Sequence, residues 1–391
     1  MILAMIARMI PETTIESTQR VRPSRSDNGE DLVKKSQPSG RPRGRMGSVG
    51  GVAILGSGTF LPERVVTNED LNALGCDSEW IVRRTGILER RHADAGQSTG
   101  DLCYEAAVRC LADAGVSAEE LDLILVATIT PDHFTPSTAC LLQQRLGAFA
   151  PAMDLSAACA GFMYAMTTAA QFIATGNAKR VLVIGADLMS RTINPDDKKT
   201  YPLFGDGAGA VLMGPADEAS ETDSSGNDSA NGSGQSLAPG ILSFQLGSEG
   251  SGPEVLGIPA GGTRLPLTAD ICGTSDQYLN MDGRNVFKWA VRVFEESASD
   301  VLSDAGVDSD DLAMVVMHQA NQRIIDSAVA ALGVPTEKVF VNLDRYGNTS
   351  GASIPIVLDE AIKAGKLRSG DLALLCGFGS GLAWGTAVVR L

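Results

Sequence analysis

The sequence is poor in several residue types on which particular functions depend. Only 3 of its 391 residues are His, and its 7 cysteines form no C-x-x-C pair. This argues against a Cys-rich zinc site or a disulfide framework and favours a reducing, cytoplasmic environment. No apolar run reaches the roughly 18 residues that a membrane helix needs, so we expect no membrane partner. Acidic residues outnumber basic ones by 47 to 32, and the net charge of −15 disfavours a nucleic-acid partner.

Residues that build a core are plentiful, since hydrophobic types make up 44% of the chain. Two segments differ from the rest of the chain in that they contain few large apolar residues. Residues 1–48 are basic and rich in Ser, Pro and Arg, and residues 217–238 form an acidic Ser/Gly insertion. We predict that both are disordered, because neither buries enough apolar surface to offset its ordering entropy. An over-extended gene start explains the N-terminal segment equally well, since another possible start, Met46, stands just before the first predicted strand.

The rest of the chain alternates short apolar runs with helical patterns. The runs predict buried strands at residues 52–55, Leu123–Ala127, Ala152–Leu155, 180–185, Met314–Met317 and 339–343. Helical spacing lies between them, for example at residues 101–114 and 160–175. This alternation predicts an α/β fold whose parallel or mixed sheets are covered by helices on both faces.

Two stretches of this chain repeat one another. Residues 111–121 and 302–312 are identical in six of eleven positions, and each stretch leads into a predicted apolar strand. We therefore predict a duplicated fold with two similar halves, residues 49–216 and 239–391, and an active site where the halves meet.

One cysteine is distinguished by its position. Cys159 follows the predicted strand Ala152–Leu155 and comes just before a predicted helix, among small residues that let a substrate approach. A helix N-terminus favours the thiolate, and its N–H groups can hold an oxyanion. A packed structural cysteine explains the local sequence equally well. The other six cysteines stand in patterns that need only a small buried residue.

Two polar residues follow predicted strands in the second half. His318 comes directly after Met314–Met317, where open α/β sheets place their ligands. Asn348 lies in a Gly-Asn-Thr-Ser turn after the predicted strand 339–343. A helix-capping histidine and a simple turn asparagine are the alternatives. The remaining histidines, His92 and His133, are predicted to lie at the surface or in loops.

Taken in chain order, these motifs resemble the β-ketoacyl-acyl carrier protein synthase III family from about residue 49 to residue 391. The matching motifs are WIVRRTGI from Trp80, ACAGF around Cys159, FGDGAGA from Phe204, HQAN from His318, GNTS around Asn348 and the Gly-rich end from Phe378. The resemblance implies a thiolase-like fold with αβαβα layers and a homodimer. It also implies the condensation that starts type II fatty acid synthesis, in which acyl-coenzyme A and malonyl-acyl carrier protein give 3-oxoacyl-acyl carrier protein. That reaction needs no metal and no cofactor.

The resemblance also implies a role for each matching residue. Cys159 would be the nucleophile, and His318 and Asn348 would hydrogen-bond the malonyl thioester oxygen. Backbone N–H groups of Cys159 and Ser380 would hold the oxyanion. Coenzyme A would be bound by Trp80, Arg84, Thr85 and Lys198. The carrier protein would contact Lys288, Gln319, Ala320, Asn321, Gln322 and Arg323. The acyl pocket would include Phe204, Phe378 and, from the partner subunit, Thr135, where some members carry Phe.

Three other functions compete with this interpretation. A thiolase would need a second catalytic cysteine, and Cys376 stands one residue too early for that role. A synthase III paralogue that primes a polyketide or another specialised pathway would share the Cys-His-Asn set. A catalytically dead binding module is disfavoured, because all three reactive residues are present.

Overall fold

The structure is a computed structural model that describes residues 44–218, 239–252 and 254–391. Most of the two segments predicted as disordered, residues 1–43 and 219–238, lies outside these ranges. For residues 44–48 the prediction is wrong, because strand β1 (Arg45–Gly50) pairs antiparallel with β9 (Gly240–Ser248). Small residues allow this pairing: a Cβ on Gly47 would lie 2.7 Å from the Phe244 ring. Glu218, predicted to belong to the insertion, forms an ion pair with Arg180.

Two five-stranded sheets that share the order of four strands form the fold. The first has the order β2 (Val52–Phe60), β8 (Asp206–Pro215), β7 (Val181–Leu188), β5 (Leu123–Ala127) and β6 (Ala152–Leu155). The second has the order β1, β9, β14 (Ala383–Arg390), β13 (Leu372–Gly379) and β12 (Met314–Met317). Strands β2, β5, β7 and β8 thus correspond to β9, β12, β13 and β14, with the same parallel and antiparallel pairings. This shared order is the repeat that the sequence predicts.

The predicted strand at residues 339–343 is reduced to a single bridge, so that prediction is wrong. Val339 pairs with Val315 in the position that β6 occupies in the first sheet. The neighbouring backbone bonds to a side chain instead. Gln319 donates from Nε2 to the Phe340 carbonyl (3.4 Å) and accepts the Asn342 N–H at Oε1 (3.3 Å). A short helix, α10 (Leu343–Tyr346), then ends the extended run.

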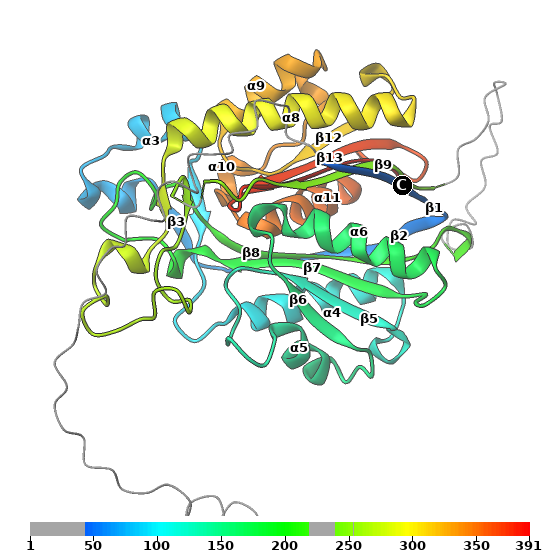
Figure 1. Ribbon diagram of the computed structural model, residues 1–391, viewed down its shortest axis with the longest axis horizontal. Helices are drawn as coiled ribbons and strands as arrows, with labels where there is room; N and C mark the ends of the chain where they lie inside the picture. The colour runs from blue at the N-terminus through cyan, green and yellow to red at the C-terminus, as the bar shows by residue number, and fades with distance from the viewer. Residues whose placement is uncertain (1–43, 219–238, 253) are drawn as a thin grey trace, which may run out of the picture. The chain divides into compact units, whose positions relative to one another are not determined.

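Five layers stack in the order αβαβα (Figure 1). The buried helices α6 (Gly161–Ala174) and α11 (Ser353–Lys363) lie between the sheets. Helices α4 (Thr99–Ala114) and α5 (Thr138–Leu146) cover the first sheet, and α8 (Gly283–Ala305) and α9 (Gln322–Leu332) cover the second. Smaller elements complete the described chain: β3 (Val65–Thr67), α3 (Ser78–Thr85), β4 (Glu89–Arg91), β10 (Leu256–Gly257) and β11 (Asn280–Met281). None of the helices within the described ranges is long and apolar enough to cross a bilayer.

Three side chains differ in burial from what the sequence predicts. His92 lies in the loop after β4, which fits the predicted surface or loop position, but its side chain is buried, with Nε2 3.4 Å from the Phe204 carbonyl oxygen. Cys140 and Cys272, predicted to be buried, are exposed. Cys140 lies on α5, and Cys272 lies in an irregular segment between β10 and β11.

Candidate active site

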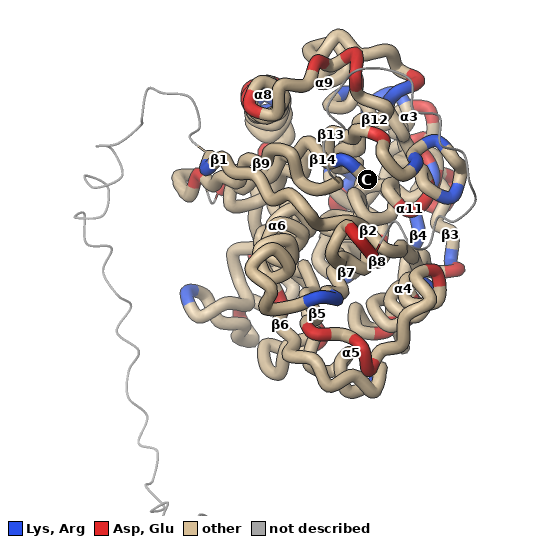
Figure 2. Tube along the Cα trace, turned by 90° about the vertical axis from the view of Figure 1, so that its right-hand side faces the viewer, with Lys and Arg blue, Asp and Glu red and all other residues tan. Residues whose placement is uncertain are grey.

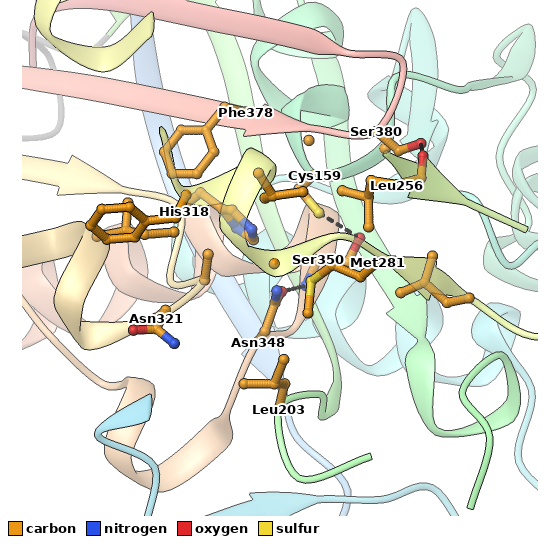
Figure 3. Close-up of a pocket in the computed structure, with 18 of the residues that line it drawn as sticks. Cys159, Leu203, Leu256, Met281, His318, Asn321, Asn348, Ser350, Phe378 and Ser380 are labelled. Atoms are coloured by element: carbon orange, nitrogen blue, oxygen red, sulfur yellow. Dashed lines mark hydrogen bonds between the residues drawn. The ribbon is translucent and has the colours of Figure 1, made fainter. Parts of the chain in front are cut away.

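Cys159 lies where a strand passes into a buried helix. After β6 the chain makes a turn of 3-10 helix, Ala158–Ala160, that runs directly into α6. Ala158 has a left-handed φ of 47°, a conformation that side chains other than glycine rarely adopt. Cys159 is 9% exposed and lines a cavity of about 500 Å³. His318 and Asn348 line the same cavity, so the structure brings the predicted trio together (Figure 3).

The end of β13 packs directly on this turn. A Cβ on Gly379 would lie 2.8 Å from the Cys159 nitrogen and 2.9 Å from its Cβ, so only glycine fits here. Ser380 follows at the cavity wall, and its hydroxyl donates to the Leu256 carbonyl at 2.6 Å. The close approach places the backbone of Ser380 beside the nucleophile turn.

His318 is a buried, neutral imidazole at the end of β12. Its backbone N–H donates to the Cys376 carbonyl (2.8 Å), and its ring packs edge-on against Phe378, with 5.4 Å between ring centroids. Burial lowers the pKa of His318 to about 3, so the ring is uncharged at neutral pH. In the described structure its buried Nδ1 has no hydrogen-bond partner. A neutral ring retains one donor nitrogen, which can bond to a substrate oxygen.

Asn348 is fixed by its backbone and one side-chain oxygen. Its N–H donates to the Leu203 carbonyl (2.8 Å), and its own carbonyl accepts the Gly205 N–H (3.0 Å). Its Oδ1 accepts the Ser350 N–H at 2.9 Å. Since the oxygen end of the amide is engaged, the donor end is the one directed to a ligand. His318 and Asn348 therefore present two donors to one cavity.

Ser350 is a site residue that the sequence analysis missed. Its side chain is fully buried, and its Oγ lies 3.4 Å from the Cys159 Sγ. Like Ala158 it has a left-handed backbone, with φ of 52°. The one sequence signal is its place two residues after Asn348 in the Gly-Asn-Thr-Ser motif, which is also typical of an ordinary turn.

The expected thiolate form of Cys159 needs correction. Burial raises the pKa of the Cys159 thiol to about 12, although its hydrogen bond with Ser350 acts in the opposite direction. The predicted thiolate is therefore not the resting state of the free protein, because desolvation outweighs the favourable partial charge of the helix start. The proton must leave when the sulfur reacts.

The predicted coenzyme A residues lie outside this cavity, and two of them stack on each other. The Arg84 guanidinium carbon is 4.1 Å from the centroid of the half-buried Trp80 ring, both on α3. Asn321 at the cavity connects to α3 by donating from Nδ2 to the Arg84 carbonyl (3.1 Å). The Thr85 hydroxyl is buried and already pairs with the Ile81 carbonyl. Lys198 is exposed in the segment before β8.

The predicted carrier-protein residues divide between surface and interior. Lys288, Ala320, Asn321 and Arg323 line the cavity, and both cations are exposed. Gln322 donates to Asp326 along α9. Gln319 is 1% exposed with both ends of its amide bonded inside the fold, so its assignment as a carrier-protein contact is corrected. Figure 2 marks the Lys and Arg positions, which include two in the last turn of α3.

Two of the three predicted acyl-pocket residues line the cavity of Cys159, and the third lines another cavity. Phe204 and Phe378 line the cavity of Cys159, whereas Thr135 lines a second cavity of about 1230 Å³. Ile129 lies on both cavities, so they adjoin. Phe134, next to Thr135, is 90% exposed.

Three residues that could have carried other chemistry have structural partners. Cys376 Sγ lies 3.2 Å from the Thr386 hydroxyl, and Cys376 does not line the cavity, so it does not provide a thiolase's second cysteine. The Asp154 carboxylate accepts the N–H groups of Thr138 and Ala139 at the start of α5. Asp206 accepts the Ala93 and Ser190 N–H groups.

The duplicated sheets and the buried cysteine site define a thiolase-fold condensing enzyme. The 3-oxoacyl-[acyl-carrier-protein] synthase III from Aquifex aeolicus is 43% identical, with a TM-score of 0.75 over 88% of this chain and 100% of that one. The priming β-ketosynthase from the R1128 polyketide biosynthetic pathway is 34% identical, with a TM-score of 0.76 over 90% of this chain and 99% of that one.

Sequence relatives narrow this class to one family. Family models described as 3-oxoacyl-[acyl-carrier-protein (ACP)] synthase III and as its C terminal match residues 153–229 and 302–391. The β-ketoacyl-[acyl-carrier-protein] synthase III of Rhodopirellula baltica is 68% identical over 347 residues, which cover 88% of this chain and 100% of that protein. This chain belongs to the β-ketoacyl-acyl carrier protein synthase III family.

Proposed function

We propose that this protein catalyses the initiating condensation of type II fatty acid synthesis in the cytoplasm. It takes an acyl group from acyl-coenzyme A and joins it to malonyl-acyl carrier protein, releasing carbon dioxide and coenzyme A. The observation that carries this proposal is the shared cavity of Cys159, His318 and Asn348, in which a buried thiol faces two uncharged hydrogen-bond donors.

The first half-reaction uses Cys159 as nucleophile. Its sulfur attacks the thioester carbonyl of acyl-coenzyme A, coenzyme A leaves, and the acyl group stays on the sulfur. The N–H groups of Cys159 and Ser380 hold the tetrahedral oxyanion. The close packing of Gly379 against Cys159 and the place of Ser380 on the same cavity support this pairing.

The second half-reaction uses His318 and Asn348. They donate to the malonyl thioester oxygen, on which negative charge develops as carbon dioxide departs. A neutral imidazole can perform this task, since it retains one N–H that can donate to the oxygen, and burial keeps His318 neutral. The resulting carbanion attacks the acyl-Cys159 thioester and gives the 3-oxoacyl product.

Residues at and near the cavity of Cys159 support the proposed binding of coenzyme A and of the carrier protein. Trp80 and Arg84 on α3 provide an aromatic face and a cation for a nucleotide, joined to the cavity through Asn321. Exposed Lys288 and Arg323 are local cations on an acidic protein, which suits the docking of an acidic carrier protein. Lys198 is proposed as a second contact for the nucleotide.

A homodimer is part of the proposal. Strand β6 ends the first sheet with one edge unpaired in the described structure, and large apolar side chains are exposed near it: Phe134, Phe149 and Met153. Unpaired edges and exposed apolar residues together favour association with another chain. Thr135 would then reach the acyl pocket of the partner.

The direct test is product formation from purified components. Incubation with acetyl-coenzyme A and malonyl-acyl carrier protein should release carbon dioxide and give acetoacetyl-acyl carrier protein, identified by mass. Cys159→Ala should abolish the product, and Cys110→Ala, which alters a buried cysteine on α4, should retain it. An acyl-enzyme that accepts another nucleophile but never malonyl-acyl carrier protein would refute the proposal and favour a specialised paralogue.

A further inference from the structure

A buried arginine close to the site has no role in the mechanism above. Arg90, in β4, is fully buried. Its Nη1 donates to the Val66 carbonyl (3.1 Å), and its Nη2 donates to Asn68 Oδ1 (2.8 Å) and to the Pro202 carbonyl (2.7 Å). Within the described ranges no carboxylate forms an ion pair with this guanidinium. Burial lowers its pKa to about 10, so it stays charged at neutral pH. A buried cation without a counter-charge is costly, so we expect its hydrogen bonds to do more than fill space.

Arg90 connects the β3–β4 pair to the chain just before β8. On the side of β3 and β4, its partner Asn68 is fully buried and held at both ends of its amide, because Nδ2 donates to the Ile87 carbonyl (2.8 Å). The Asn68 backbone N–H also donates to the Leu88 carbonyl (3.2 Å). On the other side, the guanidinium nitrogen that binds Asn68 donates to Pro202 as well. The position of the Pro202 carbonyl is therefore tied to a side chain that β3 and β4 hold in place.

Residues 202–205 lie along the backbone of Asn348. The Leu203 carbonyl accepts the Asn348 N–H (2.8 Å), and the Gly205 N–H donates to the Asn348 carbonyl (3.0 Å). These two bonds make a parallel bridge between Phe204 and Asn348. Leu203 and Phe204 also line the same cavity as Asn348. Both bonds that fix the Asn348 main chain therefore come from the segment whose first carbonyl the buried arginine binds.

Close packing leaves this connection little room to move. A Cβ on Gly347, the residue before Asn348, would lie 2.8 Å from the Leu203 carbonyl oxygen and 3.3 Å from the Arg90 Cβ. A Cβ on Gly205 would also lie 3.3 Å from the Arg90 Cβ. The stem of Arg90 thus packs against the backbones of both glycines, and its guanidinium holds the chain that leads to one of them. A shift of that chain would therefore be passed to Asn348.

We infer that Arg90 is a positioning residue for the second half-reaction, which holds the chain before β8 so that the Asn348 amide is directed to the malonyl thioester oxygen. A planar guanidinium can do this because it donates in fixed directions, whereas a lysine ammonium is a point charge. The first half-reaction depends on Cys159 and the Ser380 backbone, which follow β6 and β13 and take no part in these contacts. Loss of the guanidinium should therefore affect decarboxylation and spare acylation. The inference rests on the proposed function.

The test measures the two half-reactions separately in Arg90→Lys and Arg90→Met. Coenzyme A release from acetyl-coenzyme A reports acylation, and carbon dioxide release from malonyl-acyl carrier protein on preformed acetyl-enzyme reports decarboxylation. Both variants should slow decarboxylation at least about tenfold, because a small displacement of a donor weakens its bond to developing charge. Acylation should stay within about twofold of the wild type, since Cys159 and Ser380 are held by other strands.

The matched control is Asp359→Asn, which alters a buried carboxylate of α11 that accepts the hydroxyls of Ser57 and Thr59. It should lower stability and leave the ratio of the two rates unchanged. A double-mutant cycle then tests whether Arg90 acts through Asn348. In the Asn348→Ala background, Arg90→Lys should slow decarboxylation by less than about a further twofold, since no amide remains to be directed.

Two kinetic results would overturn the inference. Arg90 variants that slow acylation and decarboxylation by the same factor would show that this arginine only supports the fold. A full tenfold loss in the Asn348→Ala background would show that it acts on another group. If the wild type performs neither half-reaction, the proposed function fails, and hydrogen exchange of the Asn348 N–H then tests the connection by itself. This exchange should be at least about tenfold faster in Arg90→Lys, with the exchange of β7 unchanged, and an unaltered rate at Asn348 would contradict the connection.

Discussion

Ala158 and Ser350, which adopt left-handed backbones with φ of 47° and 52°, meet at the sulfur of Cys159. Ala158 precedes the nucleophile, and the Ser350 hydroxyl contacts it from the loop after Asn348. Such conformations cost about 1–3 kcal/mol each and persist where the surrounding structure enforces them. Here the enforcing contacts come from both sheets, since Gly379 of β13 and Asp187 of β7 pack on the two loops. The site therefore depends on how the duplicated halves meet.

The two donors should act in the second half-reaction more than in the first. We expect His318→Ala and Asn348→Ala to slow malonyl decarboxylation about a hundredfold or more, because each removes a hydrogen bond to developing charge. Cys159 acylation should fall much less. Carbon dioxide release from preformed acyl-enzyme, compared with coenzyme A release from free enzyme, separates the steps. Normal decarboxylation with defective acylation in both variants would reverse the assigned roles.

His318 should make the protein sensitive to acid in a particular pH range. Its pKa is about 3 when folded, below the ordinary value of about 6.5, so the unfolded chain binds the proton more readily between these values. The stabilisation is complete above pH 6.5 and is lost as pH falls toward 3. Compared with His318→Gln, the wild type should lose more stability in urea titrations between pH 7 and pH 4. A stability difference that stays constant over this range would show that His318 is not buried as a neutral ring.

Strand β1 should be needed for stability, although the sequence analysis assigns most of it to a disordered extension. A chain that begins at residue 51 loses the pairing with β9 and the buried Val49 side chain, which alone contributes about 2 kcal/mol. A chain that begins at residue 44 keeps both and is the matched control. Thermal unfolding should show a lower midpoint for the shorter chain only. Equal midpoints would mean that β1 adds nothing to the core.

Thr135 should make the proposed partner's acyl pocket more spacious than a Phe would. Each methylene that fits contributes only about 0.8 kcal/mol, so the discrimination between starters should be modest. We expect isobutyryl-coenzyme A, and to a lesser degree octanoyl-coenzyme A, to match or exceed acetyl-coenzyme A in kcat/KM. Thr135→Phe should shift the preference toward acetyl. A strong acetyl preference that the substitution leaves unchanged would refute this role.

Features that depend on local pattern could be predicted from the sequence. The apolar runs of β5 and β12 are recognisable because buried strands need them, and the repeat before these two strands predicts the duplicated layers, whereas β6, also predicted to be buried, is a partly exposed edge strand. Cys159, His318 and Asn348 follow strands or precede helices in recognisable motifs. Their convergence on one cavity is a structural finding.

Features that depend on partners distant in the sequence could not be predicted. The run at 339–343 is as apolar as a strand, yet the Gln319 side chain takes up its backbone groups. β1 contains little that marks a strand, and its order depends on pairing with β9, almost 200 residues away. Ser350 resembles any turn serine until Cys159 is placed beside it. The pKa of Cys159 likewise depends on how deeply the fold buries its side chain, which cannot be read from the local motif.

The acyl-Cys159 intermediate is tested most directly by the mass of the Cys159 peptide after brief incubation with acetyl-coenzyme A, acid quenching and proteolysis. We expect one acetyl group on this peptide, an equivalent amount of released coenzyme A, and loss of the modification when malonyl-acyl carrier protein is added. In Cys159→Ala no peptide should be acetylated, whereas Cys110→Ala should behave as the wild type. An unmodified Cys159 peptide in an enzyme that still forms 3-oxoacyl product, or stable acetylation at another residue, would contradict it.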